Sequence, residues 1–71
     1  MKTIAEFVKA QRKLNKLTQH ELSKKGGVGL RFIKELEAGK KTMRLDKVNQ
    51  ILFLFGYVLS PVKIKGDEKI S

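Results

Sequence analysis

One stretch of the chain carries four side chains, at helical spacing, that could contact the edges of DNA bases. Arg31 has a planar guanidinium whose parallel donors match O6 and N7 of guanine. Leu30 could touch a thymine methyl, and Lys34 could take a phosphate or a guanine. The alternative is a merely exposed face on which Arg31 and Glu35, four residues apart, pair with each other. Both interpretations hold if that pair positions the arginine.

The sequence lacks the residues that catalysis or metal binding would need. The 71 residues include no cysteine and a single histidine, His20, which helical spacing places on an exposed face. Without clustered carboxylates the sequence offers no nucleophile and base pair and no ligand set for zinc. We therefore expect neither an enzyme nor a protein that needs a cofactor or a metal.

The charge balance favours a polyanionic partner. Sixteen Lys and Arg against seven Asp and Glu give a net charge of +9, with an isoelectric point near 10.1. Because each neutralised phosphate releases bound counterions, such a chain gains affinity for nucleic acid. Many small soluble proteins are equally basic without binding nucleic acid, so the charge needs a structural motif beside it. RNA is the weaker interpretation, because the aromatic residues are not interleaved with basic ones as in single-strand binders.

The stretch from Leu17 to Gly39 predicts the two helices that would position these side chains. Thr18 and Glu21 form a capping box, so a helix begins at the residue after the threonine. Gly27 can adopt the left-handed conformation that ends this helix, and Gly29 can cap the next one. Two helices joined by such a turn make a helix-turn-helix, whose second helix can enter the major groove of DNA.

Helices are expected on both sides of this motif. Before it, an apolar stripe predicts a first helix that runs through Lys16, and after Leu45 another stripe predicts a fourth helix that closes at Gly56. Phe53 and Leu54 lie off the main stripe of this helix, which suggests that it also contacts another subunit. The inward residues expected from all the helices are Ile4, Phe7, Val8, Leu14, Leu22, Ile33, Leu36, Val48, Ile51, Leu52 and Phe55.

The pattern changes over residues 57–64, where β-branched and aromatic residues without a helical stripe predict one strand. No second strand candidate exists, so this strand must pair with its copy in another subunit or lie on the surface as extended coil. Pro61, which lacks an N–H, limits the ladder. A chain of 71 residues without disulfides also gains stability from a partner. We therefore predict a homodimer, closed near its centre by Phe55, Tyr57, Val58 and Leu59.

The predicted domain spans residues 1–65, and the polar residues 66–71 are expected to form a disordered tail. The start of the chain does not read as a signal peptide, and the longest apolar run, Ile51–Phe55, is too short to span a bilayer. We expect a cytoplasmic, nucleoid-associated protein that does not enter membranes.

The order of residues in the motif resembles the XRE (Cro and lambda-repressor-like) DNA-binding domains. The resemblance rests on Thr-Gln-x-Glu-Leu from Thr18, Gly-Val at Gly27, Ile-x-x-Leu-Glu from Ile33 and the closing Gly-Lys at Gly39. Within that family, residues 29–37 and 45–50 resemble HipB-type antitoxins. The resemblance covers about residues 4–64. It implies an all-α, lambda-repressor-like bundle of four helices with a short C-terminal β-strand that pairs across a homodimer.

The resemblance also implies roles for single residues. Arg12 is expected to pair with Glu37 as a structural clamp rather than as a site. Phe32 stands where the family usually has a small hydroxyl residue, so a phosphate contact is lost there and packing on the first or second helix is expected. Phosphate contacts are expected instead from Gln19, Lys40, Lys41 and Thr42, with a solvated basic turn as the alternative for the loop residues.

The predicted function is a dimeric transcriptional repressor that binds double-stranded DNA at an inverted-repeat operator, with half-sites roughly 34 Å apart. The likeness to HipB implies the antitoxin of a type II toxin–antitoxin system, which represses its own operon and binds a HipA-like serine/threonine kinase toxin. The alternative is a stand-alone phage-type or HigA-like regulator with no kinase partner.

Overall fold

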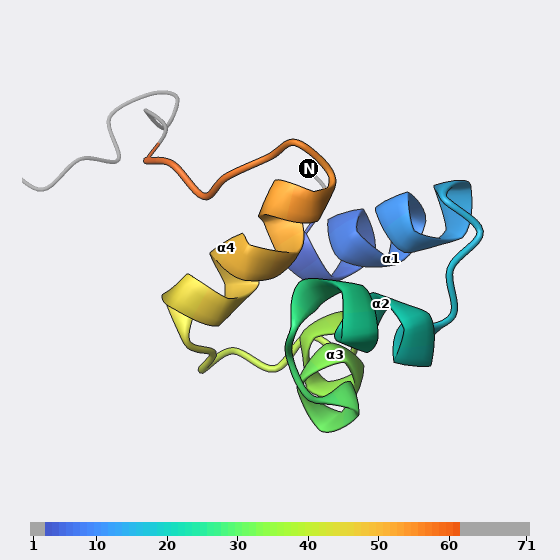
Figure 1. Ribbon diagram of the computed structural model, residues 1–71. Coiled ribbons are helices and arrows are strands. Elements are labelled where there is room, and N and C mark those ends of the chain that lie inside the picture. The colour runs from blue at the N-terminus through green and yellow to red at the C-terminus, as the bar shows by residue number, and fades with distance from the viewer. Residues whose placement is uncertain (1–2, 62–71) are drawn as a thin grey trace, which may run out of the picture.

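Four α-helices follow one another in the computed structural model, which describes residues 3–61 (Figure 1). They are α1 (Ile4–Leu14), α2 (Gln19–Gly26), α3 (Leu30–Glu37) and α4 (Leu45–Leu54). α3 packs against both α1 and α2, and α4 packs against α2. Each helix of the predicted motif is therefore supported by a flanking helix, as the expected all-α bundle requires. None of the described helices is long and apolar enough to cross a membrane.

All four helices contribute to one core of apolar side chains. Its buried members are Val8, Leu22, Ile33, Leu36, Val48, Ile51 and Leu52, and the helical stripes predicted every one of them. Phe7 and Phe55 are half-buried against this core. Two expected core residues are wrong, because Ile4 is 40% and Leu14 75% exposed. Both stand at an end of α1, where fewer neighbours surround a side chain.

The motif's two helices begin where the sequence predicts, and α2 begins with a capping box. The Glu21 backbone N–H donates to Thr18 Oγ1 at 3.0 Å, and the Thr18 N–H donates to Glu21 Oε1 at 2.8 Å. The bonds from the Thr18 N–H and, secondarily, from its side chain hold the pKa of Glu21 below its ordinary value. Gly29 takes the N-cap position of α3, as expected.

α1 ends at Leu14, two residues before the predicted boundary. Asn15 follows it, and its Nδ2 donates to the Gln11 carbonyl oxygen at 2.8 Å. The Leu17 N–H then reaches back to the Arg12 carbonyl oxygen at 3.0 Å. This bond completes a Schellman motif, which places Lys16 in the left-handed region at φ +57°.

The other three helices end with the same bonding pattern but with glycine at the left-handed position. Backbone N–H groups reach back across the helix ends from Val28 to Ser23, from Lys40 to Glu35 and from Tyr57 to Leu52. The glycines are Gly27 at φ +69°, Gly39 at +85° and Gly56 at +83°. Lys16 is thus the one side chain in residues 3–61 that is held at a positive φ.

Gly26 is required for a different reason from Gly27. It is the buried last residue of α2, and a β-carbon there would overlap Cδ1 of Ile51 in α4. Gln50, also in α4, donates its Nε2 to the Gly26 carbonyl oxygen at 2.6 Å. Gly27 therefore ends the helix, as expected, whereas Gly26 lies inside it and permits close packing of α2 on α4.

The segment after α4 forms no strand within residues 57–61. It returns onto its own domain instead: the Tyr57 ring stands edge-on to Phe7 of α1, with centroids 4.7 Å apart. The Leu59 N–H donates to Asn49 Oδ1 of α4 at 2.7 Å, and the Leu59 side chain packs on the core. The described part of the chain contains no strand, so pairing with another copy stays a prediction. The rest of the predicted strand, residues 62–64, and the predicted tail, residues 66–71, lie outside the described residues.

Candidate nucleic-acid interface

α3 presents a polar face opposite the side chains that anchor it in the core. Ile33 and Leu36 are buried, while the Arg31 side chain is 90% exposed and Lys34 is exposed as well. Leu30 is half-buried. The apolar anchoring therefore fixes the helix while leaving Arg31 and Lys34 accessible to a groove.

Glu35 is shared between two of the predicted DNA contacts. Its Oε2 lies 3.5 Å from Arg31 Nε and 3.4 Å from Lys40 Nζ. The predicted pair between residues 31 and 35 is present, and the arginine remains exposed, so both interpretations of Arg31 are compatible with the structure. Sequence spacing gave no signal for the contact with Lys40, which depends on how the chain turns after α3.

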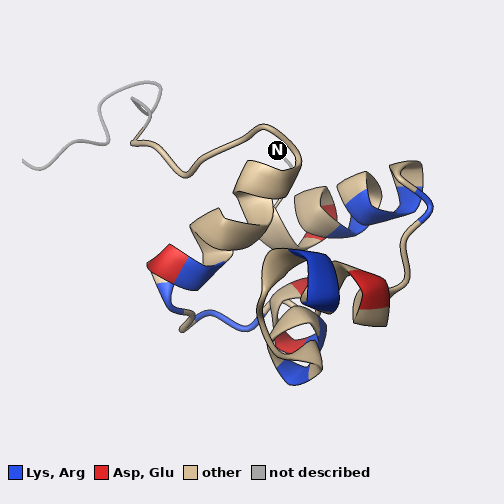
Figure 2. Ribbon diagram, in the orientation of Figure 1, with Lys and Arg blue, Asp and Glu red and all other residues tan. Residues whose placement is uncertain are grey.

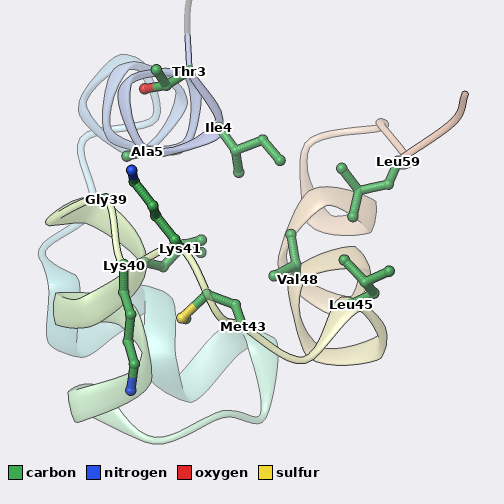
Figure 3. A pocket seen from close by; sticks show the side chains of 11 residues that line it. Thr3, Ile4, Ala5, Gly39, Lys40, Lys41, Met43, Leu45, Val48 and Leu59 are labelled. Carbon is green, nitrogen blue, oxygen red and sulfur yellow. The ribbon is translucent and has the colours of Figure 1, made fainter. Parts of the chain in front are cut away.

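The basic loop after α3 sends its two lysines in opposite directions. Figure 3 shows the Lys41 amine pointing toward Ala5 at the start of α1, whereas the Lys40 amine points away from it. Both side chains border a cavity of about 350 Å³ whose walls are mainly apolar. Lys40, Lys41 and Thr42 are all exposed, so the loop can meet a phosphate backbone, but Lys40 must share its amine with Glu35.

Arg12 and Glu37 form the clamp that the family resemblance implies. Arg12 Nε donates to Glu37 Oε2 at 2.7 Å, and Nη2 donates to Oε1 at 3.0 Å. Nη1 of Arg12 also donates to the Leu17 carbonyl oxygen at 2.8 Å. The two side chains are only 12% and 3% exposed, and hydrogen bonding to Glu37 raises the pKa of Arg12. The clamp joins α1, the link before α2 and the end of α3.

Gln19 belongs to this clamp, which the sequence did not predict. Its Nε2 donates to Glu37 Oε1 at 3.2 Å, and the side chain is half-buried. A phosphate contact from Gln19 would have to share this amide group with Glu37. The carboxamide therefore orients the start of α2 against the end of α3, besides any role toward DNA.

Phe32 packs against the core, as its apolar ring leads one to expect. Its aromatic face is approached by the Lys47 amine of α4, 6.0 Å from the ring centroid. That core includes residues of α1 and α2, the expected partners, and the Lys47 contact adds α4. An apolar ring in this place offers no hydroxyl to a phosphate.

The described surface has cations in excess of free anions. Figure 2 shows basic residues on all four helices and on the loop before α4. Glu35, Glu37 and Asp46 are ion-paired, and Arg44 holds the pKa of Asp46 below its ordinary value. Within residues 3–61, the lysines outside these ion pairs are Lys9, Lys13, Lys16, Lys24, Lys25, Lys34, Lys41 and Lys47. The same residues include no group of His, Cys, Asp and Glu that could hold a metal ion.

The four predicted dimer residues divide into two pairs. Phe55 and Leu59 are half-buried against the chain's own core, whereas Tyr57 is 49% and Val58 56% exposed. The two α4 residues that lie off its main stripe, Phe53 and Leu54, are also exposed. Phe53, Leu54, Tyr57 and Val58 are thus the exposed apolar residues at the end of α4 and just after it, and we refer to them together as the α4 patch.

Comparisons with known proteins agree with this architecture. Residues 8–57 match the family HTH_3, described as Helix-turn-helix. A protein of Sinorhizobium fredii (strain NBRC 101917 / NGR234), the uncharacterized HTH-type transcriptional regulator y4mF, is 49% identical over 53 residues, which cover 75% of this chain and 70% of that protein. Together with the capped helices, the glycine turn and the exposed face of α3, these matches show that the chain belongs to the XRE-type helix-turn-helix family.

Proposed function

We propose that this protein is a transcriptional repressor that reads a specific DNA sequence by inserting α3 into the major groove. The observation that carries the proposal is Arg31, which is 90% exposed on a helix that the core and the Arg12–Glu37 clamp hold in place. A rigidly mounted arginine can form two hydrogen bonds to guanine, which discriminates against other bases by about 1–3 kcal/mol. The unpaired lysines supply attraction to phosphates that does not depend on sequence.

The repressor acts as a homodimer on an inverted repeat. The α4 patch supports this, because exposed apolar residues that lie within six positions of one another in the sequence are costly to leave in water. Strand pairing through residues 57–64 would add to this contact. Two copies related by a two-fold axis would place their α3 helices in successive major grooves, roughly 34 Å apart.

Within this function we favour an antitoxin that represses its own operon and binds a HipA-like serine/threonine kinase. The support is the likeness of residues 29–37 and 45–50 to HipB-type antitoxins. The Sinorhizobium fredii relative is named only as a transcriptional regulator, so a stand-alone phage-type or HigA-like regulator is the second candidate. Purification of the chain from its native host, followed by identification of co-purifying proteins, separates the two: recovery of a kinase supports the antitoxin, and its absence supports the second candidate.

DNA reading is tested by selecting preferred duplexes from a random pool and measuring gel shifts at fixed salt. Arg31→Ala should lower the ratio of operator to random-duplex affinity by about five- to 140-fold, if the arginine reads guanine. Arg44→Ala is the matched control, because it removes another exposed, ion-paired arginine outside α3. It should weaken both duplexes alike. An unchanged ratio in Arg31→Ala would remove this residue as the base reader.

Dimerisation is tested with Val58→Asp, which places a charge in the α4 patch without touching the buried core. Sedimentation of this variant should give a monomer that keeps its helical circular dichroism. A dimer that survives the charge would mean that the α4 patch is not the contact between subunits.

A further inference from the structure

We propose that Glu35 is a positioning residue that makes the interface discriminate between its operator and other DNA. This role rests on the proposed DNA-reading function. Glu35 belongs neither to the buried core nor to the Arg12–Glu37 clamp. The carboxylate would not read a base itself. It would hold Arg31 in place for a guanine and keep Arg31 and Lys40 from the phosphates of other DNA.

The geometry makes Glu35 the link between the base-reading helix and the basic loop. Its Oε2 pairs with Arg31 Nε at 3.5 Å and with Lys40 Nζ at 3.4 Å. The backbone joins the same residues, because the Lys40 N–H donates to the Glu35 carbonyl oxygen at 3.1 Å. One side chain therefore restrains both a candidate base contact and a candidate phosphate contact.

The pair with Glu35 is compatible with a contact between the terminal guanidinium nitrogens of Arg31 and a base. Nε makes the closest approach to the carboxylate, at 3.5 Å, and an arginine held there can turn its two terminal Nη groups toward guanine O6 and N7. An arginine that is 90% exposed would otherwise lose much rotamer freedom on binding. Glu35 therefore lowers the cost of placing Arg31 on a guanine.

On DNA without that guanine the same carboxylate works against binding. Arg31 and Lys40 would have to leave Glu35 to reach phosphates. The side chain, 32% exposed, would then face the backbone as an uncompensated negative charge. This repulsion would act mainly on DNA that lacks the guanine. An interface gains specificity in this way, because binding to the operator is weakened little. Glu35 should thus weaken binding to random DNA more than binding to the operator.

The test compares Glu35→Gln with Asp46→Asn, which removes one negative charge from an exposed, arginine-paired carboxylate outside α3. Dissociation constants are measured for the selected operator and for a random duplex at several salt concentrations. Glu35→Gln should bind the random duplex more tightly and lower the specificity ratio about fivefold, the size expected for exposed ion pairs. Asp46→Asn should shift both duplexes alike.

Three outcomes would contradict this role. An unchanged ratio in Glu35→Gln with a specific wild-type protein refutes the role of Glu35 alone. A change confined to one base pair of the operator would mean that the carboxylate accepts from a base. A wild-type protein that prefers no duplex refutes the proposed function as well. Nuclear magnetic resonance checks the geometry without DNA: the Arg31 Nε–H signal should shift in Glu35→Gln and stay unchanged in Asp46→Asn.

Discussion

Replacing Lys16 by glycine should stabilise the protein, although the substitution removes a side chain and adds no contact. Lys16 is held at φ +57° by the Schellman motif that ends α1, where the other three helices have glycine. An L-residue in this region costs about 1–2 kcal/mol, because its β-carbon crowds the following carbonyl oxygen. The greater conformational freedom of glycine in the unfolded chain offsets about 0.4–1 kcal/mol of the stability gained by relieving this strain. We expect a net gain of about 0.8 kcal/mol, which raises Tm by roughly 3–6 °C in a domain of this size.

Thermal unfolding followed by circular dichroism, at one protein concentration, measures this shift. Lys16→Ala is the control, because it removes the charge but keeps the β-carbon, and its Tm should not rise. Gly39→Ala tests the reverse change: φ is +85° there, and an added β-carbon would meet no atom within 4 Å. Its loss of about 1 kcal/mol would then come from the backbone alone. If Lys16→Gly leaves Tm unchanged, or if Lys16→Ala raises it equally, backbone strain at Lys16 is not the cause.

Two further substitutions test the packing that holds the motif. Gly26→Ala should destabilise the fold by about 1–3 kcal/mol in urea unfolding, because the new methyl group collides with the buried Ile51 side chain; a neutral result would mean that the end of the Ile51 side chain moves aside at no cost. Glu37→Ala should cost about 3–5 kcal/mol, since it leaves the guanidinium of Arg12 buried without its carboxylate. The double variant Arg12→Met/Glu37→Met should recover part of this loss, and no recovery would argue that the charge is not what makes Glu37→Ala costly.

The local features of the chain could be predicted because each depends on residues close in sequence. The capping box of Thr18 and Glu21 and the left-handed turn at Gly27 are set by hydrogen bonds and sterics within one helical turn. The apolar stripes found every fully buried side chain, since helical periodicity fixes which residues share a face. The clamp between Arg12 and Glu37 is a long-range contact, and it could be expected only because the motif resembles a known family.

The tertiary structure decided the contacts between elements that the spacing of residues leaves open. The direction of the chain after α3 brings Lys40 to Glu35, and the packing of α2 on α3 brings Gln19 into the clamp. The closeness of α4 makes Gly26 a steric requirement rather than a helix breaker. Asn49 draws the segment after α4 back onto its own domain. Such contacts depend on the distance and orientation of whole helices, which only the shared core fixes. The sequence by itself therefore determined that α3 presents Arg31 and Lys34. The tertiary structure decided which neighbours, such as Lys40, pair with the charged residues of this helix.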